Sequence, residues 1–138
     1  MTAMTSSAEL PASRARLLVI DDEPDFLEVM QLVLESEGYD VTVAESGRRA
    51  VEQARVEHFD LAITDMRMPG MSGLETLAAL REIDPHVPVI VATGYASDET
   101  RRRFREAGAC DYLPKPVDLG ELLARVDAAL GTARSQAR

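Results

Sequence analysis

The sequence predicts an α/β fold in which a single parallel sheet is covered by helices on both faces. Three observations support this prediction. The 138 residues suit one domain, and 46% of them are apolar, which is enough for a well-filled core. Five short apolar runs also alternate with amphipathic stretches along the chain. Because parallel strands need long crossover connections, which are usually helices, this alternation favours a parallel sheet.

The first half of the chain is predicted to contain two strands and two helices. Residues 17–20 and 41–44 are short apolar runs, which favours strands. The stretch between them, residues 25–38, carries apolar side chains at helical spacing, namely Phe26, Val29, Met30, Val33 and Leu34. Gly38 is a natural end for this helix. Ser46 suits the N-cap of the next helix, whose apolar residues are Ala50, Val51, Ala54 and Val56.

The second half continues the alternation with three strands and three helices. The strands are residues 61–64, 87–92 and 111–113. The turn-forming loop MRMPGMSG leads into a helix that carries Leu74, Leu77, Ala78 and Leu80 on one side. A helix over residues 97–107 is closed by Gly108. The last helix starts at Asp118, which stands at capping-box spacing from Glu121, and Gly131 marks its end.

Composition and termini narrow the class of protein. Residues 1–15 are interpreted as a disordered leader, residues 16–131 as the domain and residues 132–138 as a frayed tail. No apolar run approaches a membrane span and no secretory signal is readable, so we expect a cytoplasmic protein without membrane contact. The net charge of −9 disfavours direct nucleic-acid binding. The one cysteine, Cys110, cannot form an internal disulfide and is expected to be buried.

Polar side chains follow four of the predicted strands. They are Asp21 and Asp22 after the first strand, Asp65 after the third, Thr93 after the fourth and Lys115 past the fifth. In open parallel sheets, ligands bind beyond the carboxyl ends of the strands. Three carboxylates at one place repel one another unless a cation neutralises them. Mg²⁺ meets that need because it prefers oxygen ligands and pairs with phosphate, and one carboxylate can then attack phosphorus.

The alternative is that each aspartate only caps a helix or a turn. Any one of them could do so. Phosphoryl transfer, however, needs a cation, an ammonium and a hydroxyl to stabilise charge on the equatorial oxygens. Because all of these residue types stand at strand ends, the sequence favours a phosphoryl-transfer site over unrelated caps.

Four segments together carry a resemblance to a known family. LLVIDDEP, LAITDMRMPGMSG, VIVATGY and YLPKP resemble the receiver domain of two-component response regulators, over residues 16–131. The resemblance implies a flavodoxin-like, doubly wound sheet of five parallel strands in the order 2-1-3-4-5, with five helices. It also implies a phosphorelay signalling domain, which catalyses only its own phosphorylation and dephosphorylation, rather than an enzyme.

The resemblance also implies roles for individual residues. Asp65 matches the phosphoacceptor, and Lys115 its salt-bridge partner. The Mg²⁺ ligands implied are Asp21, Asp22, Asp65 and the backbone carbonyl of Arg67. Thr93 and Tyr112 match the switch residues that respond to the phosphoryl group. The Lys115–Pro116 bond is expected to be cis.

Two kinds of partner follow from the resemblance. The phosphoryl donor would be a sensor histidine kinase or a phosphotransfer protein. A downstream protein would bind the surface of the fourth helix, fifth strand and fifth helix, around Arg101, Arg102, Arg103, Arg105 and Tyr112. Alternatively, the arginines are a solvated helix face that pairs with Asp98, Glu99 and Glu106.

Other functions remain open from the sequence. A magnesium-dependent phosphatase of the haloacid dehalogenase type also uses a strand-end aspartate, but it carries D-x-D after the first strand, where this chain has Asp22 followed by Glu23 and Pro24. A flavodoxin-like cofactor binder would need phosphate-binding hydroxyls and glycines there, whereas an acidic pair repels phosphate. The domain could stand alone, act within a phosphorelay or belong to a longer protein.

Overall fold

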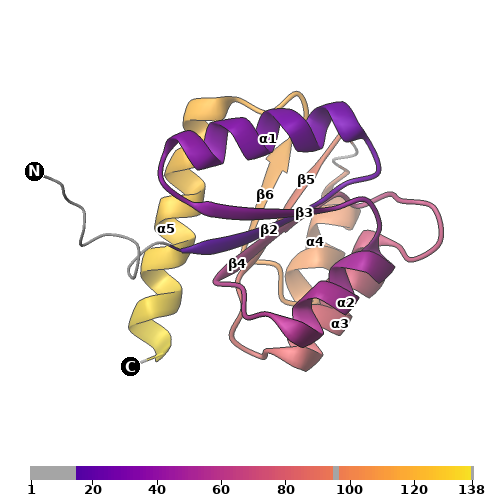
Figure 1. The fold of residues 1–138 in the computed structure, drawn as a ribbon. Helices are drawn as coiled ribbons and strands as arrows, with labels where there is room; N and C mark the ends of the chain where they lie inside the picture. The colour runs from indigo at the N-terminus through magenta and orange to yellow at the C-terminus, as the bar shows by residue number, and fades with distance from the viewer. Residues whose placement is uncertain (1–14, 95–96, 138) are drawn as a thin grey trace, which may run out of the picture.

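The described residues form a five-stranded parallel sheet between two layers of helices. A computed structural model of the chain describes residues 15–94 and 97–137, with side chains as far as Gly131. The strands are β2 (Arg16–Ile20), β3 (Asp40–Ala44), β4 (Leu61–Thr64), β5 (Val89–Thr93) and β6 (Asp111–Pro114). They lie in the order β3-β2-β4-β5-β6 (Figure 1), so the predicted order 2-1-3-4-5 is confirmed.

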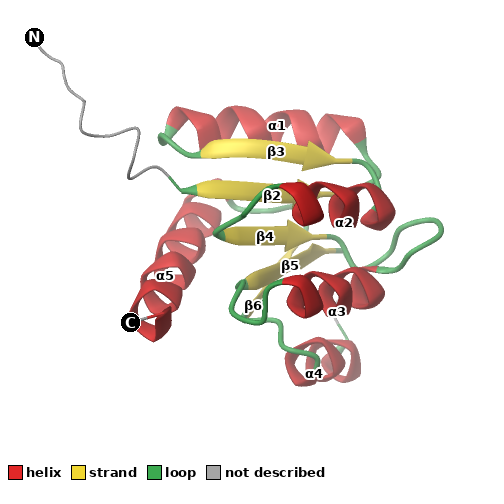
Figure 2. Cartoon of the chain, turned by 60° about the horizontal axis from the view of Figure 1, so that its bottom comes forward, coloured by secondary structure: helices red, strands yellow, loops and turns green. Residues whose placement is uncertain are grey.

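Five helices connect and cover the strands. They are α1 (Pro24–Ser36), α2 (Gly47–Val56), α3 (Gly73–Ile83), α4 (Asp98–Glu106) and α5 (Leu119–Ala137). Helices α1 and α5 pack on one face of the sheet, and α2, α3 and α4 on the other (Figure 2). None of the described helices is long and apolar enough to cross a membrane.

The central strand β2 supplies side chains to both halves of the core. Leu17 and Val19 join the cluster under α1 and α5, whereas Leu18 and Ile20 join the cluster under the other three helices. Successive side chains of a strand point to opposite faces, so a strand covered on both sides is apolar throughout. This explains why the run over residues 17–20 identifies a strand without polar alternation.

The buried face of α1 differs from the predicted one. Leu27, Met30 and Leu34 are buried, whereas Val29, which the helical spacing placed on the core face, is 47% exposed. The helix begins at Pro24, which suits a first helical position because its missing N–H would have no helical partner there. Because most residues between 26 and 34 are apolar, the sequence pattern alone does not show which face of the helix is buried.

Serine caps begin three of the helices. The Ser46 side chain accepts a hydrogen bond from the backbone N–H of Arg49, which confirms the predicted N-cap of α2. Ser72 forms a full capping box with Glu75 at α3, and Ser97 caps α4. At the far end of α2, Val56 is 77% exposed and does not share the buried face of Ala50 and Val51, because the helix ends there. Ala78 of α3 is likewise exposed.

Two further predictions are wrong. Cys110 is exposed rather than buried, because it lies just before β6, the strand at the edge of the sheet. Helix α5 does not end at Gly131 but continues to Ala137, so residues 132–137 are helical. The predicted leader lies outside the described residues apart from Ala15, which is buried. The domain limits as a whole remain a prediction.

We expect a Gly131→Ala substitution to stabilise the domain. Gly131 is exposed inside α5, and an added Cβ would meet no described atom within 4 Å. Alanine restricts the unfolded chain and favours helix, so the expected gain is about 0.5–1 kcal/mol. Urea denaturation of the two proteins measures it, and a lower midpoint for the variant would contradict a helix that continues through residue 131.

Candidate functional site

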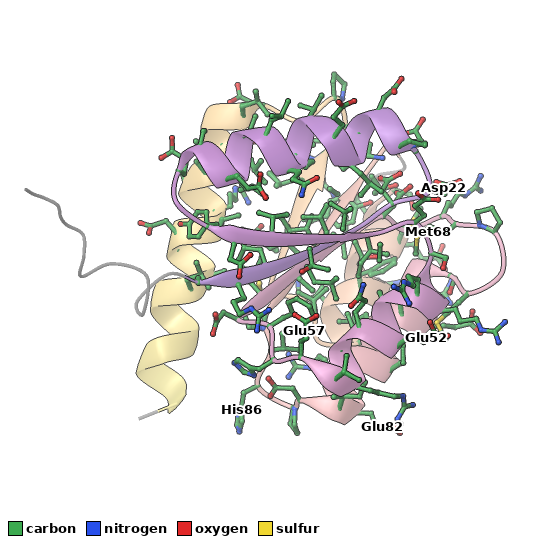
Figure 3. The ribbon with its side chains drawn as sticks, viewed as in Figure 1. Asp22, Glu52, Glu57, Met68, Glu82 and His86 are labelled. Atoms are coloured by element: carbon green, nitrogen blue, oxygen red, sulfur yellow. The ribbon has the colours of Figure 1, made fainter. Side chains whose placement is uncertain are left out.

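The predicted site residues lie at the carboxyl edge of the sheet. Asp21 and Asp22 follow β2, Asp65 follows β4, Thr93 ends β5 and Lys115 follows β6. Figure 3 places Asp22 and Met68 close together at this edge, while Glu57 and His86 lie toward the opposite edge. One ligand atom from each of the three aspartates lies within 4.8 Å of the others. The parallel arrangement brings these residues together because all strands end on the same side.

Asp21 and Lys115 form the buried ion pair of the site. The Asp21 side chain is fully buried, and its Oδ1 accepts a hydrogen bond from the backbone N–H of Glu23 at 2.9 Å. Its Oδ2 accepts one from the Lys115 ammonium at 2.6 Å. Burial raises the pKa of Asp21 despite these bonds. Burial alone would lower the pKa of Lys115, but the carboxylates of Asp21, Asp65 and Glu23 raise it overall, which keeps the ammonium charged.

Asp65 presents its carboxylate between the loop and the lysine. Its Oδ1 accepts a hydrogen bond from the backbone N–H of Met66 at 2.7 Å. Its Oδ2 lies 3.7 Å from the Lys115 ammonium nitrogen. The residue is 9% exposed, so the carboxylate is fixed by its surroundings and still reachable from solvent. One oxygen is therefore oriented by the backbone and the other faces a positive charge.

Gly73 holds the segment that carries Asp65. Its backbone N–H donates to the carbonyl oxygen of Met66 at 2.9 Å. A Cβ at this position would lie 2.1 Å from the carbonyl oxygen of Asp65 and 2.7 Å from the Cα of Met66. Both are backbone atoms that cannot rotate away. The start of α3 therefore packs against the Asp65 backbone only because residue 73 has no side chain. The sequence showed a turn-forming glycine there but not this contact.

The donor set fits a small, hard cation. Three carboxylates with ligand atoms this close together repel one another, and oxygen is the ligand that Mg²⁺ prefers in proteins. Asp22 is exposed, so a cation could reach the cluster from solvent. Arg67 lies on the exposed loop after β4, and the role of its backbone carbonyl stays a prediction.

The two residues expected to form the switch lie on neighbouring strands. Thr93 is buried at the end of β5, and Tyr112 of β6 is opposite Val91 in the same strand pair. The Tyr112 ring is half-buried and lies under the guanidinium of Arg101, 5.1 Å from ring centroid to carbon. Burial raises the pKa of the Tyr112 hydroxyl. The bond between Lys115 and Pro116 is cis, as expected.

The arginine cluster is exposed on α4. Arg101, Arg102, Arg103 and Arg105 are all exposed, and none forms an ion pair with another described residue. In particular, no such pair joins them to Asp98, Glu99 or Glu106. The helix face is therefore solvated, as in the alternative, but its expected pairing with these acids is not seen among the described residues.

A groove lies beside this cluster. It has a volume of about 480 Å³, and its lining includes Arg101, Phe104, Arg105, Tyr112 and Pro114. The lining also includes Arg125 of α5 and the acids Asp111 and Glu121, so it combines apolar and aromatic groups with charges of both signs. The groove joins α4, β6 and α5 into one continuous surface.

The fold and the site together define a doubly wound α/β domain with a carboxylate and lysine site at the sheet's carboxyl edge. The chain belongs to the response regulator receiver domain family, whose model matches residues 17–127. It is thus a receiver domain of two-component signal transduction. The comparisons do not support the haloacid dehalogenase alternative.

Curated relatives are longer proteins with a similar segment. The transcriptional regulatory protein ZraR of Escherichia coli K12 is 40% identical over 119 residues, which cover 86% of this chain and 27% of that protein. The response regulator protein PilR of Pseudomonas aeruginosa is 41% identical over 118 residues, with 86% and 26% covered. The chain thus spans about a quarter of the length of these two relatives.

Solved structures agree with the fold. A CheY-like response regulator receiver domain protein from Methanospirillum hungatei JF-1 superimposes with a TM-score of 0.86 at 32% identity, covering 89% of this chain and 98% of that one. The chemotaxis protein CheY4 of Vibrio cholerae gives a TM-score of 0.81 at 30% identity, with 84% and 98% covered. Nearly the whole of each of these proteins is therefore matched.

Proposed function

We propose that this receiver domain accepts a phosphoryl group on Asp65 from a sensor histidine kinase or a phosphotransfer protein. The observation that carries the proposal is the position of the Asp65 carboxylate, next to two further aspartates and 3.7 Å from the Lys115 ammonium. A nucleophile, a cation-binding set and a fixed positive charge thus meet within one edge of the sheet. That combination suits phosphoryl transfer, in which positioning and charge stabilisation do most of the catalysis.

The chemical step follows from these positions. An Asp65 oxygen attacks the phosphorus of a phosphohistidine, a new O–P bond forms, and the P–N bond breaks with its electron pair left on the imidazole. Lys115 supplies positive charge to the transferred phosphoryl oxygens. Asp21, Asp22, Asp65 and the carbonyl of Arg67 would hold Mg²⁺, which when bound offsets the negative charge of the site. The same site would later allow water to hydrolyse the acyl phosphate.

Phosphorylation would then alter the surface around α4. The modification adds a charge of about −1.5 to −2 at Asp65. Thr93 donates a hydrogen bond to the new phosphoryl group, and Tyr112 turns inward into the space that Thr93 leaves. Because Tyr112 lines the groove beside Arg101, this motion changes the surface formed by α4, β6 and α5.

The chemistry of that surface indicates its downstream partner. Arg101, Arg102, Arg103 and Arg105 are exposed without ion pairs among the described residues, so an acidic protein surface would complement them. The overall charge of −9 disfavours direct contact with nucleic acid. The proposal includes a cytoplasmic location, since response regulators generally work there.

Intact-mass measurement tests the proposed function. The chain is incubated with acetyl phosphate and Mg²⁺, and we expect the mass of one added phosphoryl group. A sample with a chelator in place of Mg²⁺ should gain none. If the protein instead keeps its mass and releases phosphate continuously from small phosphate esters, it is a hydrolase and the proposal fails.

A further inference from the structure

The Lys115 ammonium has a fourth neighbour that is not a carboxylate. Its nitrogen lies 2.6 Å from Asp21 Oδ2, 3.5 Å from Glu23 Oε1 and 3.7 Å from Asp65 Oδ2. It also lies 4.2 Å from the centroid of the Phe26 ring. The Lys115 side chain is 17% exposed, so it is largely shielded from solvent.

Two of these neighbours of the Lys115 ammonium are Glu23, just before α1, and Phe26, within α1. Phe26 is held in place more firmly than Glu23. The Glu23 side chain is 67% exposed, and an exposed ion pair contributes little. The Phe26 ring is half-buried and packs against the core cluster under α1 and α5. A cation over an aromatic face is attracted by the ring, and more strongly when water is excluded from it. The ring therefore provides a rigid surface for the ammonium.

In the proposed reaction, the Lys115 ammonium interacts first with Asp21 and then with Asp65. In this structure its shortest bond is to Asp21, whereas the proposed reaction needs its charge at Asp65, 3.7 Å away. A hydrogen bond to Asp21 has a preferred direction and weakens as the ammonium turns. The attraction to a ring face has no such single direction, so the ammonium keeps it while turning toward Asp65.

We propose that Phe26 is a positioning residue for phosphoryl transfer, whose ring holds the Lys115 ammonium between Asp21 and Asp65. The inference rests on the proposed function, because it assigns Phe26 a part in the reaction at Asp65. In this role Phe26 acts through Lys115, whose ammonium lies 4.2 Å from the ring centroid. Its aromatic face, rather than its volume, is the property that matters.

A substitution series at residue 26 tests this property. Phe26→Leu and Phe26→Met keep an apolar side chain and remove the ring face, whereas Phe26→Tyr and Phe26→Trp keep a ring. Phosphorylation rates are measured by intact mass over a range of acetyl phosphate concentrations with Mg²⁺. We expect the maximal rate to fall about fivefold for Leu and Met, and to stay within about twofold for Tyr. The half-saturating concentration should change less than the maximal rate.

Stability measurements separate positioning from packing. Urea denaturation ranks the variants by their effect on the fold, and a positioning role requires that the rates follow aromatic character instead of that ranking. Leu32→Ala serves as a matched control, since Leu32 is a 64% exposed apolar residue of the same helix. Its rate should equal that of the unaltered protein. Rates that follow stability would overturn the proposal.

Nuclear magnetic resonance gives a readout that does not depend on phosphorylation. A ring over the ammonium shifts the side-chain methylene signals of Lys115, and Phe26→Leu should remove that shift. Unchanged signals would show that the ring does not face the lysine. If the unaltered protein takes up no phosphoryl group, the proposed function fails. If it does so and the Leu and Met variants match it, only the role of Phe26 fails.

Discussion

An Asp65→Asn variant is expected to gain no phosphoryl group under conditions in which the unaltered chain gains one. The amide keeps the shape of the side chain, but it replaces a charged oxygen with an NH₂ group and makes the remaining oxygen a far weaker nucleophile. It also removes one negative charge from the three-aspartate cluster, which weakens cation binding there. Both effects act on the same step, so we expect phosphorylation below detection by intact mass.

Folding should survive this substitution. Asp65 is not the main partner of Lys115, whose shorter bond runs to Asp21 at 2.6 Å. Loss of one of three repelling carboxylates also relieves electrostatic repulsion within the cluster. Urea denaturation should therefore show a stability equal to or above that of the unaltered protein. Asp127→Asn, at an exposed position of α5, is the matched control and should be phosphorylated normally.

The same pair of measurements can contradict the assignment. A phosphoryl group on the Asp65→Asn protein would place the acceptor elsewhere. Absence of the modification together with a large loss of stability would mean that the variant reports on folding rather than on chemistry. The assignment of Asp65 stands only if phosphorylation is lost in a protein that remains folded.

The sequence predicted the sheet well because the three central strands are buried on both faces. Residues 61–63 are apolar, Thr64 is the last residue of the strand, and the charged Asp65 follows directly. The parallel order then places the residue after each strand at one edge. Asp21, Asp65 and Lys115 could therefore be predicted as neighbours although 94 positions separate the first from the last.

Other features depend on distances that a sequence pattern does not contain. The side chains of α1 that become buried are those that face the sheet in the folded protein. Leu27 is therefore in the core, whereas Val29 is not. The contact between Phe26 and Lys115 joins the first helix to the loop after the last strand. A helical pattern identifies Phe26 only as apolar. The exposure of Cys110 likewise follows from its place beside an edge strand.

Gly131 and Gly73 have structural roles that differ from those their sequence patterns indicate. A glycine near the end of a helical pattern is typical of a helix end, but α5 continues through Gly131. Gly73 follows a serine cap, where a sequence pattern indicates only a turn. In the structure it is a position at which an added Cβ would lie 2.1 Å from the Asp65 carbonyl oxygen. The roles of these two glycines depend on which atoms surround them in the folded protein, and the sequence does not show those atoms.

A Gly73→Ala substitution should therefore destabilise the domain and slow phosphorylation. The added Cβ would lie 2.1 Å from the Asp65 carbonyl oxygen, so either α3 or the Asp65 segment has to move. Overpacking of this kind costs about 1–3 kcal/mol. Since a shift of about 1 Å at a reacting group can cost about 10²-fold in rate, we expect phosphorylation to fall by up to that factor. Urea denaturation and intact-mass kinetics measure the two effects.

Two other glycines separate the effect on the site from the effect on stability. Gly131→Ala makes the same chemical change where no described atom lies within 4 Å, and it should leave the rate unaltered. Gly47→Ala would place its Cβ 2.0 Å from Thr76 Oγ1, which is a side-chain atom, so it should destabilise the packing of α2 on α3 without moving Asp65. If the folded Gly47→Ala protein loses as much phosphorylation rate as Gly73→Ala, the rate responds to general loosening. If only Gly73→Ala slows the reaction, the start of α3 positions the phosphoacceptor through direct backbone contact.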